Sequence, residues 1–194
     1  TAEIAITATG TAANPIVFQK SGTGVNPVVT RTDVGSLATA AIGAQGNAVI
    51  SIAGTDYITF NAINVAATDA LGGIEYGYET IKPSGTDGCQ NVTISNCTVT
   101  MTKAASPFVV GIYVGNGSTS VSSATGVTVT ATSGENANIS IIGNTIQNVH
   151  AGVMVRGSSA AGFYDESITV GQSGAGNTDR KSTRLNSSHE WISR

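Results

Sequence analysis

Two stretches of this sequence share a spacing of apolar residues that decides the fold. Residues 91–99 read NVTISNCTV, and residues 138–146 read NISIIGNTI. In the first stretch Ile94 is followed three and five positions later by Cys97 and Val99, and the second stretch keeps these offsets. Successive residues on one face of a strand are two positions apart. The three-residue step therefore predicts a bend between two short strands.

This phrase occurs at two further places. Residues 56–60 (DYITF) begin an upstream copy in which Phe60, Ile63 and Val65 keep the same offsets, and residues 166–170 (ESITV) form a less exact copy. Recurrence of one short unit, with connections of variable length, is typical of a solenoid.

A second phrase, led by glycine, alternates with the first. It reads GIEY at residues 73–76, GIYV at 111–114 and GVMV at 152–155. Each repeat is thus predicted to hold three short strands: one led by Gly, one led by Asn and one after the bend. Earlier strands in a looser version of this arrangement are predicted at residues 4–7, 15–18, 28–30 and 49–52.

The composition supports an all-β fold. The 194 residues include 26 Thr, 19 Val and 18 Ile but only 3 Leu. Branching at Cβ restricts χ1 and suits a pleated sheet better than a helix. Helix bundles and coiled coils are therefore excluded.

The motifs NVTISNCTV, NISIIGNTI, GIYV and GVMV resemble the repeats of the right-handed parallel β-helix, the pectate-lyase-like architecture. The resemblance covers residues 1–178 and implies three short strands per coil. It also implies that the Gly-led strand lines the binding face. The relatives that it points to are repeat regions of large bacterial secreted or surface proteins, so an extracellular or cell-surface location is expected.

Residues 179–194 differ in composition from the rest of the chain. They hold 6 of the 21 charged residues, counted from the sequence, and show no β periodicity. The run DRKSTRLNSSH (residues 179–189) resembles the translation of a sequencing adapter. We therefore predict a non-native tail that packs against nothing, with the β-helix truncated at its C-terminal end because the tail replaces the third strand of the last coil.

The remaining charges exclude some classes of partner. Without the tail the chain has 5 basic and 10 acidic residues, and no basic stripe that would bind nucleic acid. No apolar run reaches the length of about 18 residues that a membrane span needs. No four-ligand metal motif is present, and no cofactor is predicted.

Within the coils the offsets predict which residues face the core. Ile94, Ile112, Val114, Ile141 and Val155 are expected to point inward.

On the Gly-led strand, Glu75, Tyr113 and Met154 are expected to form an outward column, with Tyr78 and Arg156 further along. The resemblance implies that this face contacts polysaccharide, with aromatic rings stacking on sugars and charged groups binding uronates. The alternative is an ordinary solvent-facing sheet surface.

The acidic residues do not match the catalytic motifs of enzymes with this fold. Lyases of this fold hold Ca²⁺ with clustered carboxylates, whereas here the only adjacent pair is Asp165-Glu166, which we interpret as solvated loop charge. Residues 177–179 (NTD) match one polygalacturonase motif, but the other motifs of that family are missing. The sequence thus favours a noncatalytic extracellular scaffold or adhesin-like segment that contacts glycans. The alternative is a fragment of a carbohydrate-active enzyme, a polysaccharide lyase.

Four smaller predictions concern single positions and one loop. Cys89 and Cys97 either form a disulfide or pack as small apolar residues. Asn144 is expected to adopt a left-handed conformation at a bend, without a complete asparagine ladder. His150 is expected to pack rather than to act as an acid or base. Residues 115–137 form the longest connection, with a small hairpin expected at 127–130.

Overall fold

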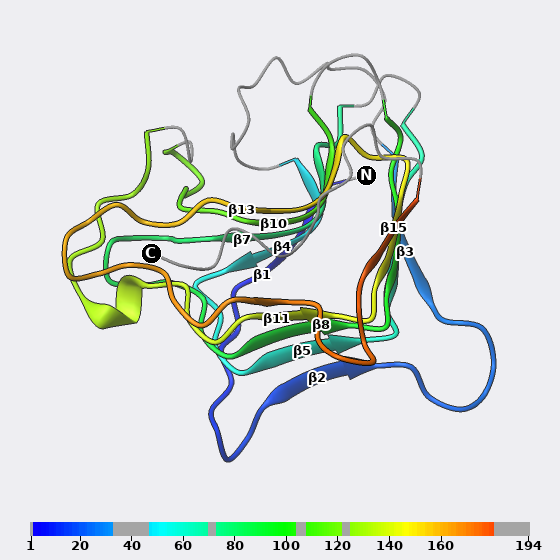
Figure 1. Cartoon of the computed structure of the whole chain (residues 1–194), viewed down its shortest axis with the longest axis horizontal. Helices are drawn as coiled ribbons and strands as arrows, with labels where there is room; N and C mark the ends of the chain where they lie inside the picture. Colours follow the sequence, from blue (N-terminus) through cyan, green and yellow to red (C-terminus); the bar gives the residue numbers. More distant parts are fainter. Residues whose placement is uncertain (1, 33–46, 70–72, 104–107, 122–124, 181–194) are drawn as a thin grey trace.

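The computed structural model describes residues 2–32, 47–69, 73–103, 108–121 and 125–180. These residues form three parallel β-sheets of five strands each, and the chain visits the sheets in strict rotation. In Figure 1 the sheets surround a common interior, with sheet A above sheet B and sheet C on the right. The prediction of an all-β parallel β-helix with three strands per coil is confirmed.

Each coil contributes one strand to each sheet. Sheet A contains β1 (Ile4–Ile6), β4 (Ala48–Ala53), β7 (Tyr76–Ile81), β10 (Val110–Val114) and β13 (Ala151–Val155). Sheet B contains β2 (Ile16–Gln19), β5 (Ile58–Asn61), β8 (Val92–Ser95), β11 (Ser140–Ile142) and β14 (Thr169–Val170). Sheet C contains β3 (Val28–Arg31), β6 (Asn64–Ala67), β9 (Thr98–Thr100), β12 (Thr145–Gln147) and β15 (Thr178–Arg180).

The bend inferred from the three-residue step lies between sheets B and C. It consists of two residues, and the first of them is left-handed: Ala62, Asn96 and Gly143 have φ values of 58°, 55° and 66°. The prediction that Asn144 itself adopts this conformation is wrong. Gly143 takes the positive φ, which costs glycine nothing, and leaves the side chain of Asn144 free to enter the interior.

A left-handed residue also stands one or two positions before four of the five sheet B strands, β2 being the exception. Tyr57, Asn91, Asn138 and Ser167 have φ values between 50° and 56°. Asparagine tolerates this region better than other residues with a side chain. The leading Asn of the repeated phrase is therefore a conformational requirement of the corner between sheets A and B.

The core is built from columns, which are sets of residues at the same position in successive coils. Ile94, Ile112, Val114 and Ile141 are buried in one continuous cluster, as predicted. Val155 pairs with Val114 and so lies on the same face of sheet A, but it is 43% exposed at the end of β13 and does not belong to this buried cluster.

The Gly-led phrase has a different register in the coil of β7 from the one expected. Tyr78 pairs with Ile112, and Glu79 pairs with Tyr113, which pairs in turn with Met154. The outward column is therefore Glu79, Tyr113 and Met154, and the placement of Glu75 in this column is wrong.

Close packing explains the register. The sequence offers a glycine at both 73 and 77, and the structure aligns Gly77 with Gly111. A Cβ atom on Gly77 would lie 2.4 Å from Cγ1 of Val99 and 2.6 Å from the carbonyl oxygen of Gly111. No side chain fits at this position.

The last coil has a third strand, contrary to the prediction. β15 pairs in parallel with β12, so that Asp179 lies beside Ile146 and Arg180 beside Gln147. Asp179 and Arg180 therefore belong to the stack of coils. The rest of the predicted tail, residues 181–194, lies outside the described residues.

The long connection between β10 and β11 forms no hairpin in its described part. Residues 127–130 are not a strand, and a short 3₁₀ turn, Thr132–Gly134, follows them. Instead the N–H groups of Val127 and Thr130 donate to the carbonyl oxygens of Asn116 and Gly85, at 2.8 and 2.9 Å. The connection is thus tied to the neighbouring loop.

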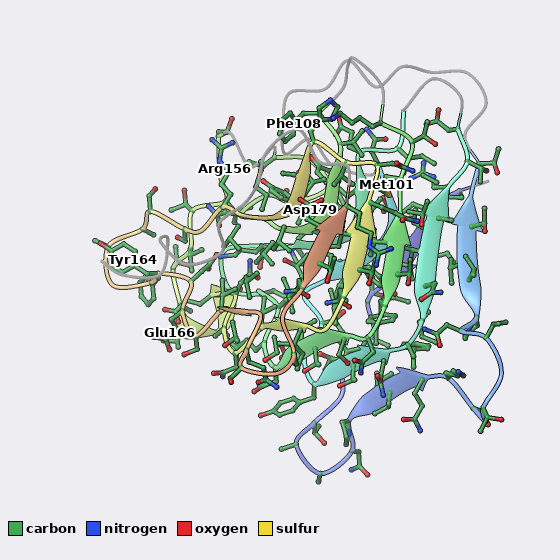
Figure 2. The ribbon with its side chains drawn as sticks, turned by 45° about the vertical axis from the view of Figure 1, so that its right-hand side comes forward. Met101, Phe108, Arg156, Tyr164, Glu166 and Asp179 are labelled. Carbon is green, nitrogen blue, oxygen red and sulfur yellow. The ribbon has the colours of Figure 1, made fainter. Side chains whose placement is uncertain are left out.

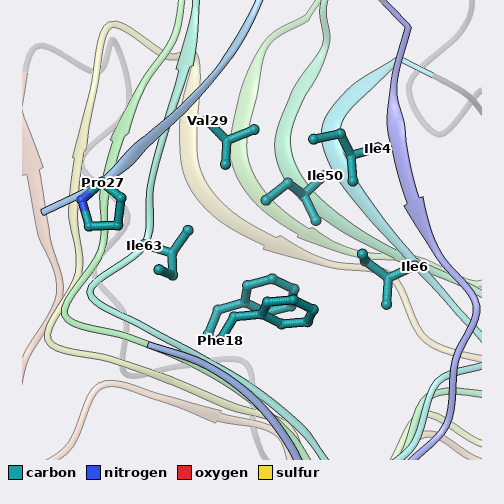
Figure 3. Close-up of a pocket in the computed structure, with 8 residues that line it drawn as sticks. Ile4, Ile6, Phe18, Pro27, Val29, Ile50 and Ile63 are labelled. Atoms are coloured by element: carbon teal, nitrogen blue, oxygen red, sulfur yellow. The ribbon is translucent and has the colours of Figure 1, made fainter. Parts of the chain in front are cut away.

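At the N-terminal end the interior opens into an apolar hollow of about 270 Å³ (Figure 3). The residues that line the hollow come from the first two coils: Ile4, Ile6, Phe18, Pro27, Val29, Ile50, Phe60 and Ile63.

No helix among the described residues is long and apolar enough to cross a membrane.

Candidate functional site

The outer face of sheet A carries a small aromatic cluster. The rings of Tyr76 and Tyr113 are stacked, with centroids 4.8 Å apart. Met154 and Phe108 pack against this cluster. Tyr113 points away from the main core as predicted, but it is fully buried, so it is not the solvent-facing aromatic that the sequence suggested.

Tyr78 does not belong to this face. Its side chain lies in the main core at 5.3 Å from the ring of Phe60. Its hydroxyl donates to the carbonyl oxygen of Ile63 at 2.7 Å. Burial raises the pKa of this hydroxyl. The placement of Tyr78 as an outward residue is therefore wrong, since Tyr78 pairs with Ile112 and lies with it in the main core.

Glu75 lies immediately before β7 and is 1% exposed. Burial raises the pKa of its carboxyl group to about 7. At neutral pH the carboxyl group of Glu75 is therefore present in both its neutral and its ionised form.

The pKa of Glu75 predicts a pH dependence of stability. Its folded-state value of about 7 lies above the ordinary 4.5, so the folded state keeps a proton that the unfolded state has already lost. The stabilisation is fully present below pH 4.5 and is lost as the pH rises to about 7. Glu75→Gln should remove this decline, which is on the order of 1 kcal/mol.

Denaturant titrations of both proteins at several pH values measure this effect. We expect the free energy of unfolding of the wild type to fall relative to that of the variant between pH 4.5 and 7. Parallel curves for the two proteins would contradict the assignment.

Met154 and Arg156 lie near the end of β13. Met154 is half-buried beside Tyr113, whereas Arg156 is exposed and donates its backbone N–H to the carbonyl oxygen of Val114 at 2.8 Å. The connection that follows carries Tyr164, which is 58% exposed. Figure 2 shows Arg156 and Tyr164 on the same side of the molecule.

A buried polar cluster, formed by Lys82, Asn136 and Asp165, was missed by the sequence analysis. The ammonium group of Lys82 forms an ion pair with Oδ1 of Asp165, and the two side chains are 0% and 2% exposed. The backbone N–H of Asn136 donates to Oδ1 of Asp165 at 2.8 Å, and its Nδ2 lies 3.4 Å from Oδ2. The interpretation of Asp165 as solvated loop charge is therefore wrong, although Glu166 is exposed.

Asn136 also ties this cluster to the backbone of two neighbouring loops. Its Nδ2 donates to the carbonyl oxygen of Gly115 at 3.0 Å, and its Oδ1 accepts the N–H of Cys89 at 3.0 Å. No sequence signal pointed to the cluster, because Lys82 and Asp165 are 83 residues apart.

Glu135, next to Asn136, is buried, and its pKa is raised. Burial is the main cause of the raised pKa, and the nearby carboxylates of Glu166 and Asp165 raise it further, while Lys82 opposes this effect.

Among the described residues no three His, Cys, Asp or Glu side chains are grouped so that they could hold a metal ion.

The two cysteines are free and buried. Of the two alternatives for them, the structure shows packing in the core, and burial raises the pKa of the Cys89 thiol to about 12. His150 stacks on Phe108, and its Nδ1 accepts the backbone N–H of Val109 at 3.0 Å. The prediction of a packing role for this histidine is confirmed.

Asn144 and Asn177 form a short ladder at the bend, and Cys97 and Ile63 occupy its earlier positions, so the predicted absence of a complete ladder is confirmed. Asn177, part of the apparent NTD motif, thus has a structural role.

Comparison of the chain with protein-family models, curated proteins and solved structures gave no match.

Proposed function

We propose that this chain is a noncatalytic β-helix segment of an extracellular or cell-surface protein, adhesin-like in character, and that it contacts glycans. The pectate-lyase-like repeat motifs and the three regular sheets support a scaffold of the kind found in large bacterial secreted and surface proteins.

The observation that carries the glycan contact is the exposure of Arg156 and Tyr164 on one connection beside the end of sheet A (Figure 2). A tyrosine ring can stack on a sugar, and a guanidinium group can bind a uronate carboxylate through two parallel hydrogen bonds. Met154, two residues before Arg156 on β13, adds a half-buried apolar side chain. Glu75 and Tyr113 are buried, so in this proposal they support the face from beneath.

Binding to immobilised polysaccharides tests this proposal. We expect the purified chain to be retained by a uronate-containing polysaccharide. Arg156→Ala and Tyr164→Ala should each weaken retention about tenfold, which corresponds to about 1.4 kcal/mol. Lys20→Ala, which removes a positive charge beyond β2 in the first coil, serves as the matched control and should leave retention unchanged.

Failure of every polysaccharide to retain the chain would contradict the glycan contact. Equal weakening by Lys20→Ala would mean that retention reflects overall charge rather than this surface.

A second candidate is a fragment of a polysaccharide lyase. The observation that favours it is Glu75, a buried carboxyl group immediately before β7 whose pKa of about 7 suits proton transfer near neutral pH. Incubation of the chain with the retained polysaccharide, with and without Ca²⁺, would release ultraviolet-absorbing unsaturated uronates if this candidate is correct. The scaffold proposal expects no such product.

A further inference from the structure

The buried cluster of Lys82, Asn136 and Asp165 brings together residues from three successive coils. Lys82 directly follows β7, Asn136 precedes β11, and Asp165 lies in the connection between β13 and β14. Neither the core columns nor the proposed glycan contact uses this cluster.

Burial isolates the ion pair from water. The side chains of Lys82 and Asp165 are 0% and 2% exposed, and two charges removed from water are costly to maintain unless they are paired and hydrogen-bonded. In a reaction that joins the two side chains, the lysine nitrogen is the nucleophile and the carboxyl carbon of the aspartate is the electrophile.

The geometry brings these two groups into direct contact. Nζ of Lys82 is hydrogen-bonded to Oδ1 of Asp165, the oxygen carried by Cγ, which is the carbon that the lysine nitrogen would attack. Holding two reacting groups next to each other lowers the entropic cost of their reaction.

Asn136 supplies hydrogen-bond donors to both carboxyl oxygens. The backbone nitrogen of Asn136 lies 2.8 Å from Oδ1 of Asp165, and its Nδ2 lies 3.4 Å from Oδ2 of Asp165. Donors fixed at these oxygens stabilise the negative charge that develops when an amine adds to the carboxyl carbon.

Glu135 provides a group that can move protons. It is buried next to Asn136, and the proximity of Asp165 contributes to its raised pKa. A carboxyl group that retains its proton at higher pH can protonate a leaving oxygen.

We propose that Lys82 and Asp165 join in an intramolecular isopeptide bond that links the coils of β7 and β13. The bond between Nζ and Cγ forms, and one bond between Cγ and oxygen breaks. Of the three protons on the ammonium group, one stays on the amide nitrogen and two leave with the oxygen as water. The reaction needs no oxidant and no co-reactant.

The intact mass of the folded full-length chain tests the proposal directly. After incubation at neutral pH, we expect a mass lower than that of the sequence by one water molecule. Proteolysis should then release a branched peptide that joins the segments containing Lys82 and Asp165.

Three variants sharpen the test. Lys82→Arg keeps the positive charge but removes the nucleophile and should restore the full mass. Lys103→Arg, the matched control at another lysine, should keep the loss of water. Glu135→Gln should slow bond formation about a hundredfold after refolding. Circular dichroism checks that each variant is folded, and the measurement on the wild type needs no variant at all.

Three results would overturn the proposal. The first is the full mass in folded wild-type protein after prolonged incubation, which would leave a noncovalent ion pair. The second is loss of water confined to an unbranched peptide, which indicates a succinimide at Asp165. The third is loss of ammonia with a link from Lys82 to Asn136, which assigns the bond to a different acceptor.

Discussion

Gly111→Ala is expected to lower the free energy of unfolding by about 2–3 kcal/mol, because the added methyl group overpacks the interior. The new Cβ would lie 2.3 Å from Cγ2 of Ile146 and 2.7 Å from the carbonyl oxygen of Gly152. Neither atom can move easily, since one belongs to a stiff β-branched side chain and the other to the backbone of the paired strand.

Gly24→Ala is the matched control for this substitution. Nothing lies within 4 Å of the Cβ that it adds, and surface changes of this kind alter stability by about 0.5 kcal/mol or less. Denaturant unfolding followed by circular dichroism measures both variants. Equal midpoints for Gly111→Ala and Gly24→Ala would show that sheet A and sheet C do not approach as closely as described.

Asn144→Ala is expected to cost about 3 kcal/mol, because it leaves two buried backbone groups without partners. The side-chain Oδ1 accepts the N–H of Cys97 at 2.9 Å, and Nδ2 donates to the carbonyl oxygen of Ile94 at 2.9 Å. Asn144 is 1% exposed, so water cannot replace these bonds without a rearrangement of the bend.

Asn177→Ala provides the comparison. Asn177 makes the equivalent bond to the carbonyl oxygen of Ile141 at 2.7 Å, but it is only half-buried in the last coil. Water can satisfy part of what is lost there, so we expect a cost of about 1 kcal/mol. The same denaturant experiment measures both variants, and a larger loss for Asn177→Ala than for Asn144→Ala would contradict the role given to the interior amide.

The proposed isopeptide bond and the glycan contact can be tested separately. Arg156 and Tyr164 are exposed, whereas the reacting groups of Lys82 and Asp165 are buried. If the isopeptide bond does not form, polysaccharide binding can still be measured in the same preparation, and the reverse also holds.

The sequence by itself determined the three-strand coil and the bend between sheets B and C. These features are local: the offsets from Ile94 to Cys97 and Val99 span six residues of one chain segment, and the left-handed residues of this bend are Asn96, Gly143 and Ala62, which follows Asn61. Local conformational preference is readable from a short stretch of sequence.

The candidate site was only partly predictable. The outward direction of Tyr113 and Met154 followed from alternation along one strand, and the exposure of Arg156 agrees with that placement. The burial of Tyr113 did not follow, because alternation assigns a residue to a face of a sheet but does not say what covers that face.

Only the tertiary structure decided which of Gly73 and Gly77 aligns with Gly111. Both registers satisfy the local pattern, and the contact with Val99 on sheet C selects Gly77. This alignment places Tyr78 beside Ile112, in the main core. The pairing of Lys82 with Asp165 was likewise decided by packing, because groups 83 residues apart meet only when the intervening coils have stacked.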